Sequence, residues 1–162
     1  MYINMKQIII GAISLVVGLF VYIMDRPLEE TYFLIYFFAN RGILNSLPDI
    51  FGVAGNVLPA FIHVFSFILL SSGLMCCGKK GCIFICFFWL IVNVFFETGQ
   101  RYSVLMLRII PDWFDVLPFF ENSRNFFLFG TFDLLDLVAV ILGTVIGYIV
   151  ILLTMEEGKC RI

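Results

Sequence analysis

The sequence predicts an all-α fold: an integral membrane bundle of four transmembrane helices, with interfacial or re-entrant helices on the outer side. Hydrophobic residues make up 62% of the 162 residues and charged residues only 14%, whereas a soluble domain averages roughly 25% charged residues. The mean hydropathy is +1.05, and the apolar residues gather into four runs. So much apolar surface requires lipid around it. We therefore expect a single membrane domain over residues 1–162.

The four apolar runs are the expected membrane helices, and they cover residues 7–24, 58–75, 82–96 and 134–153. A helix of about 20 apolar residues spans the hydrocarbon core, and slightly shorter runs can just do so. The first run could also be a secretory signal peptide with Lys6 as its basic region. Tyr22 to Asp25 offers no small-residue cleavage site, however, so a retained helix is expected. The second run opens at Pro59, a residue that a first helical turn tolerates.

The two long connections mix aromatic and charged side chains. Residues 31–39 are aromatic but too few to span a bilayer, and residues 101–132 carry Trp113 among acids and arginines. Such segments suit the headgroup region, where aromatic rings anchor the chain and charges reach water. Both segments are expected to form interfacial or re-entrant helices over one side of the bundle.

Positive charges set the expected orientation. Lys79 and Lys80 occupy the shortest connection, which the positive-inside rule places in the cytoplasm. With an even number of helices, Lys6, Lys159 and Arg161 fall on the same side. All five cysteines also lie near this face, where thiols stay reduced. The expected location is the cytoplasmic (inner or plasma) membrane, with both termini in the cytoplasm.

Several kinds of site are disfavoured. The net charge of −2 and the lack of a basic stripe argue against a nucleic-acid partner. No catalytic triad, phosphate loop, metalloprotease motif or dinucleotide fingerprint occurs. Cys76, Cys77, Cys82 and Cys86 could ligate a metal or an iron–sulfur cluster, or carry acyl groups, but they lack the CxxC pairs of zinc ribbons. Packing is the favoured interpretation, so no metal and no cofactor are expected.

Polar residues gather at the predicted outer ends of the last two membrane helices. Asn93, Glu97 and Gln100 share one face of the third helix, and Arg101 follows directly. Ionisable groups at this level are costly unless they are paired or hydrated, so a functional site is the default hypothesis. In the alternative, structural interpretation, Glu97 pairs with Arg101 and Asn93 bonds to a neighbouring helix.

The fourth helix opens with Asp133 and Asp136 on one face, and Gly143 and Gly147 continue that stripe. Small residues four apart let another helix approach closely, so the glycines could bring the third and fourth helices together. The acids could instead cap the helix, where a carboxylate contributes about 0.3–1 kcal/mol.

His63 is the only histidine, and we place it just inside the second helix on the outer side. It could share a pocket with the acids or relay protons, although a hydrogen bond to a neighbouring helix is the more common role. Gly11, Ser14 and Gly18 form a small-residue face on the first helix, which indicates packing.

A motif of polar residues and glycines runs through the C-terminal half: Glu97-x-x-Gln100, then Gly130-Thr-Phe-Asp133-Leu-Leu-Asp136, then Gly143-x-x-x-Gly147. In this it resembles the VanZ-like family of small integral membrane proteins. Gly130 replaces the family's Arg and Val140 its Asn. The resemblance implies a link to glycopeptide (teicoplanin) resistance and envelope physiology, with no agreed reaction. Without the family's Arg, an anion-binding role would need Arg101 or Arg124.

Three hypotheses for function follow. The favoured one is a VanZ-like cell-envelope protein, its reaction and any enzymatic activity unknown, whose outward-facing pocket binds a lipid-linked or polar envelope component. The expected ligand-binding residues are His63, Asn93, Glu97, Gln100, Arg101, Asp133 and Asp136. The second hypothesis is a small accessory subunit of a larger membrane complex. The third, an ion or proton pathway, is disfavoured because the inner halves of the helices are nearly all apolar. The expected partners are membrane lipids, with a lipid-linked precursor or other membrane subunits according to the hypothesis.

Overall fold

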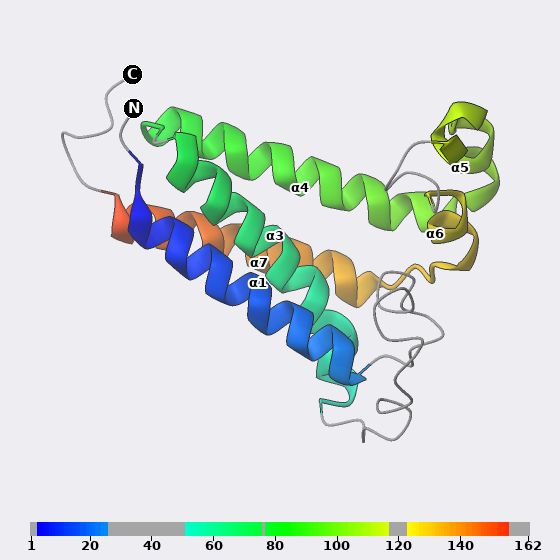
Figure 1. Cartoon of the computed structure of the whole chain (residues 1–162), viewed down its shortest axis with the longest axis horizontal. Helices are drawn as coiled ribbons and strands as arrows, with labels where there is room; N and C mark the ends of the chain where they lie inside the picture. Colours follow the sequence, from blue (N-terminus) through cyan, green and yellow to red (C-terminus); the bar gives the residue numbers. More distant parts are fainter. Residues whose placement is uncertain (1–2, 26–50, 76, 117–122, 156–162) are drawn as a thin grey trace.

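A computed structural model describes residues 3–25, 51–75, 77–116 and 123–155, in which all secondary structure is helical (Figure 1). The long helices are α1 (Met5–Asp25), α3 (Val53–Met75), α4 (Lys79–Arg101) and α7 (Leu134–Thr154). The short ones are α5 (Ser103–Ile109), the 3-10 helix η2 (Asp112–Val116) and α6 (Ser123–Phe129). The predicted all-α fold is therefore confirmed for these residues.

Three helices in the described part of the chain are long and apolar enough to cross a membrane: Ala54–Met75 within α3, Lys79–Arg101 and Leu134–Thr154. They agree with the prediction of a membrane protein. The predicted runs 58–75, 82–96 and 134–153 lie inside these helices, and the run 7–24 lies inside α1. The predicted interfacial segment at residues 31–39 lies outside the described residues.

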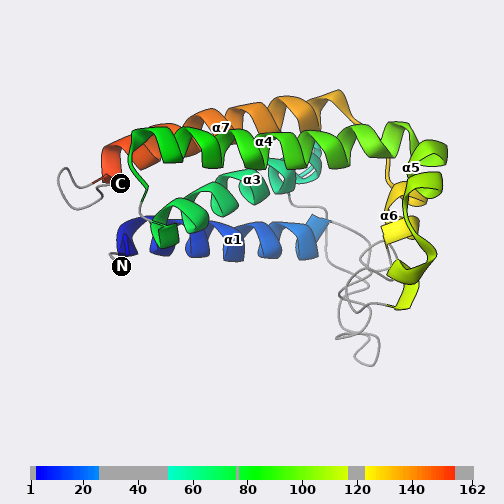
Figure 2. The same cartoon turned by 90° about the horizontal axis from the view of Figure 1, so that it is seen from above.

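The long helices run in alternating directions (Figure 1). The start of α1, the α3–α4 hairpin and the end of α7 lie at one end of the molecule, here called the hairpin end. The end of α4 and the start of α7 lie at the other, here called the cap end because α5, η2 and α6 gather there. The helix α3 is central: it packs on α1, α4 and α7 (Figure 2).

The start of α3 differs from the prediction. The helix begins at Val53, before the apolar run, so Pro59 lies inside it rather than in its first turn. Proline has no N–H to donate to the carbonyl of Gly55, four residues earlier. Membrane helices tolerate this loss where neighbouring groups or water satisfy the carbonyl. Because of the earlier start, every residue of α3 is farther from the beginning of its helix than the hydropathy pattern suggested.

Glycines allow the helices to pack closely on α3. A Cβ atom on Gly11 of α1 would lie 3.0 Å from the carbonyl oxygen of Ser66, and one on Gly18 would lie 2.6 Å from Cγ2 of Ile62. The predicted packing role of these two glycines is therefore confirmed.

The glycine stripe of α7 packs on a different helix than the sequence suggested. A Cβ atom on Gly143 would lie 2.6 Å from Cγ1 of Val64, and one on Gly147 would lie 3.3 Å from Cγ2 of Ile68. Both contacts are to α3. The suggestion that this stripe joins the third and fourth predicted helices is therefore wrong, because helical periodicity identifies a face but not the helix that covers it.

The core forms where α3, α4 and α7 meet, and its most buried side chains are Val64, Ile68, Leu69, Cys82, Cys86, Val140 and Ile151. Cys82 and Cys86 are 2% and 6% exposed, as expected for cysteines that act as small apolar residues. The Sγ atom of Cys82 also donates to the carbonyl of Cys77 (3.3 Å). Cys76 and Cys160 lie outside the described residues.

The cap packs on α4 through two aromatic side chains of α6, Phe126 and Phe127, which both contact Phe96. Phe127 of α6 is 4% exposed and stacks on Phe96 of α4, with ring centroids 6.0 Å apart. It fills a notch at Gly99, where a Cβ atom would lie 2.5 Å from its ring. Buried Met106 of α5 borders the same notch. These contacts place the cap over the polar end of α4.

Candidate functional site

The last turn of α4 contacts the segment that leads into α7. A Cβ atom on Gly130 would lie 2.7 Å from Cδ of Gln100 and 2.6 Å from the carbonyl oxygen of Phe126. Any larger residue at position 130 would displace Gln100, which explains the glycine in physical terms. The guanidinium carbon of Arg101 lies 5.3 Å from the ring centroid of Phe132, a cation–π distance. Gln100 and Arg101 are thus brought to the entrance of α7.

The acids at this end have different environments. Asp133 is exposed and caps α7, since its Oδ1 atom accepts a hydrogen bond from the backbone N–H of Leu135 (2.9 Å). Asp136, in the first turn, is half-buried. Glu97 is also half-buried, and its Oε2 atom is shielded from solvent. The capping interpretation therefore accounts for Asp133, and the other two carboxylates are the better candidates for binding.

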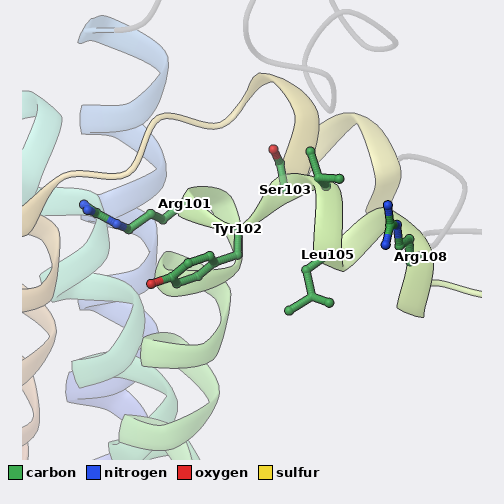
Figure 3. A pocket seen from close by; sticks show the side chains of 6 residues that line it. Arg101, Tyr102, Ser103, Leu105 and Arg108 are labelled. Carbon is green, nitrogen blue, oxygen red and sulfur yellow. The ribbon is translucent and has the colours of Figure 1, made fainter.

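A hollow of about 330 Å³ lies at the junction of α4 and α5 (Figure 3), lined by Arg101, Tyr102, Ser103, Val104, Leu105 and Arg108. The side chains of Arg101 and Arg108 point in different directions, so they do not converge on one ligand atom. Tyr102, Val104 and Leu105 are all exposed. This combination of arginine, aromatic and aliphatic groups suits the membrane headgroup region better than a closed binding cavity.

Arg124, which the sequence offered as a substitute for the missing family arginine, braces the cap. Its guanidinium group donates to Asp112 of η2 and to the carbonyl of Ile110 (3.3 Å). These bonds hold α6 against the end of α5. Of the two substitutes, Arg101 is therefore the one beside the predicted site.

His63 and Asn93 form a separate pair between α3 and α4. A side-chain hydrogen bond joins them, and the Nδ2 atom of Asn93 also donates to the carbonyl of Trp89 (2.8 Å). The indole N–H of Trp89 donates to Ser71 Oγ (2.9 Å). The ring of Phe67 lies between the histidine and the indole, with centroids 4.6 and 4.7 Å away. His63 thus interacts with a side chain of the neighbouring helix α4.

The depth expected for His63 is wrong. Because α3 begins at Val53, His63 is ten residues from its start and twelve from its end, about 15 and 18 Å. His63 is therefore near the middle of the helix rather than near its outer end. The described contacts of the His63 side chain are with Asn93 and Phe67.

A third polar group, at the hairpin end, was missed by the sequence analysis. Gln7 donates from Nε2 to Thr154 Oγ1 (3.1 Å) and accepts from Ser72 Oγ (2.9 Å). Asn4 donates from Nδ2 to the carbonyl of Thr154 (3.0 Å) and from its backbone N–H to the carbonyl of Gly73 (2.9 Å). This hairpin-end network ties α1, α3 and α7 together. Its only sequence signal is the spacing of three between Asn4, which lies just before α1, and Gln7 in the first turn.

Comparisons with known proteins add no relative: no family model, curated protein or solved structure matches the chain. Within the described residues, no group of three or more histidine, cysteine, aspartate or glutamate side chains could hold a metal ion.

Proposed function

We propose that the chain is a VanZ-like cell-envelope protein whose cap end binds a polar or lipid-linked envelope component. The observation that carries this proposal is the contact between Gln100 and Gly130. This contact holds the end of α4 beside the segment before α7. Glu97 and Gln100 of α4 therefore lie at the same end of the bundle as Asp136 of α7.

The proposal includes four membrane-spanning helices, with α1 as the fourth. This helix has 21 residues, lies along α3 and carries exposed apolar side chains that suit lipid. Lys79 and Lys80 begin α4 at the hairpin end, and the positive-inside rule assigns this end to the cytoplasm. The cap end then faces outward, and the chain termini are cytoplasmic.

The chemistry at the cap end suits a ligand with both polar and apolar parts. The carboxylates of Glu97 and Asp136 can accept hydrogen bonds from sugar hydroxyl or amine groups, or hold a cation. Exposed Val104, Leu105 and Trp113 of the cap fit the headgroup and upper acyl region. A lipid-linked glycan or amine presents these two kinds of surface together.

Native mass spectrometry of protein extracted gently from its own membrane tests the proposal. Wild type is expected to retain a lipid or lipid-linked glycan, which the double variant Glu97→Gln plus Asp136→Asn loses. The matched control is Lys79→Gln, which removes a charge at the opposite end and should leave the ligand bound. Equal ligand masses on all three proteins, or no ligand on wild type, would reject a binding role for the two acids.

A second candidate, an accessory subunit of a larger membrane complex, is supported by the outer face of α4. Phe84 and Phe87 are 72% and 61% exposed, and they line a hollow of about 440 Å³ with Phe88 and Ile91. A partner helix could fill this hollow. The test is the size of the assembly on native gels: replacing Phe84 and Phe87 with leucine keeps the face apolar but should release a partner that packs there. An unchanged assembly would argue against this face as the interface.

A further inference from the structure

His63 lies at mid-membrane depth on two independent measures. It is near the centre of α3. Its neighbours Phe61 and Val64 contact Gly143, which is nine residues from the start of α7 and eleven from its end. At this depth a polar group has no water to bond with, and an unsatisfied one costs several kcal/mol. An imidazole here therefore indicates a role that offsets this cost.

One ring nitrogen of His63 is available to a ligand. Asn93 uses its amide nitrogen to donate to Trp89, so its carbonyl oxygen is the atom that accepts from His63. A neutral imidazole has one N–H and one nitrogen with a lone pair. With the N–H directed to Asn93, the second nitrogen is an acceptor, and no other hydrogen bond to His63 occurs within the described residues. The His63 side chain is also exposed on the bundle surface.

Aromatic rings flank this nitrogen. Phe67 meets the imidazole edge to face, at an interplanar angle of 84°, and stacks on Trp89 at 26°. Both rings are only partly buried. A flat ring can pack on them while its substituent reaches His63, and such aromatic pairs are favourable beyond the area that they bury.

We propose that His63, Phe67 and Trp89 form a site, open to the bilayer, for the phenolic or quinol head group of a membrane-soluble molecule. The ligand hydroxyl donates to the free nitrogen of His63, and its ring packs on the two aromatic side chains. Lipid head groups and ester carbonyls lie at the membrane surface, about 15 Å away, and do not reach this depth. A phenol or quinol on an isoprenoid or alkyl chain dissolves in the bilayer core and therefore reaches the depth of His63. The site is independent of the proposed cap-end function.

Quenching of Trp89 fluorescence in lipid nanodiscs tests this site. The chain has two tryptophans, so Trp113→Phe leaves Trp89 as the only emitter. The probes are a long-chain alkyl bromophenol, whose bromine quenches a touching indole, and its methyl ether, which cannot donate a hydrogen bond. The phenol is expected to quench at about tenfold lower mole fraction in the lipid than the ether, the value of one well-formed hydrogen bond. His63→Leu should abolish this difference, whereas Ile141→Leu, at an exposed position of similar depth on α7, should preserve it.

Equal quenching by phenol and ether in wild type would overturn the proposal, and so would a phenol preference that survives His63→Leu. The comparison of the two probes needs no change at His63, so it holds even if that variant fails to fold. If neither probe quenches Trp89 and native mass spectrometry finds a protein partner or second copy that His63→Leu releases, a helix rather than a small molecule covers His63. That result would also overturn the proposal.

Discussion

Replacing Gln7 with methionine tests the hairpin-end network, because the change removes both side-chain hydrogen bonds at nearly constant volume. Gln7 is 3% exposed and is the junction between Ser72 of α3 and Thr154 of α7. Two orphaned buried hydroxyls would cost about 1–3 kcal/mol each. Here neither is orphaned: Ser72 also donates to the Leu69 carbonyl (3.2 Å), and Thr154 donates to the Val150 carbonyl (2.6 Å).

The expected cost of Gln7→Met is therefore that of two interhelical hydrogen bonds, about 0.6 kcal/mol each in membrane proteins, so about 1–2 kcal/mol in total. The assay is reversible unfolding in mixed detergent micelles, followed by circular dichroism. A double-mutant cycle with Ser72→Ala should give a coupling of about 0.6 kcal/mol. Ser14→Ala, at a half-buried polar position of the same helix, is the control. A loss above about 4 kcal/mol would refute the claim that the hydroxyls keep partners, and no loss would refute the network itself.

Three further predictions concern helix packing and helix capping; thermal unfolding in detergent checks the first and the third, and limited proteolysis checks the second. Gly143→Ala should destabilise by about 1–3 kcal/mol, because its Cβ atom would also lie 2.7 Å from backbone oxygen of α3; Gly147→Ala, with its nearest contact at 3.3 Å, should be neutral or stabilising. Gly99→Ala should displace the ring of Phe127 and expose the cap to proteases, and resistance equal to wild type would contradict the notch. Asp133→Ala should lower the free energy of unfolding by about 1 kcal/mol and Asp133→Asn by almost nothing, because asparagine is an equally good N-cap residue. Equal losses for the two variants would contradict the N-cap role of Asp133 at the start of α7.

Hydropathy predicted the long helices because a membrane helix needs little beyond an apolar run of the right length. It failed at the start of α3, where Gly55 and Asn56 lower the local hydropathy although the backbone is already helical. That error had a consequence for function. It assigned His63 to the outer end of a helix, whereas the structure places it near the middle.

The hairpin-end network lay beyond sequence reasoning for a different reason. Asn4 and Thr154 are 150 residues apart in sequence, and nothing in the local pattern around either residue indicates the other as its partner. Only the packing of α1 and α7 against α3 brings them together. The cap-end residues were easier to find, because they cluster in sequence at the ends of two consecutive membrane helices.

The three polar groups differ in how many of their hydrogen-bonding atoms have a partner in the protein. This difference distinguishes a structural role from a ligand-binding one. At the hairpin end, each side chain bonds within the network, and the hydroxyls keep a second, backbone acceptor. At the cap end, the Asp133 carboxylate accepts a hydrogen bond from the backbone N–H of Leu135 in α7. Near the middle of α3, His63 keeps one ring nitrogen without a protein partner within the described residues. A polar atom costs most where water is absent, and in a membrane-spanning helix water is scarcest at the middle. The inference of a ligand is therefore stronger for His63 than for the acids at the helix ends.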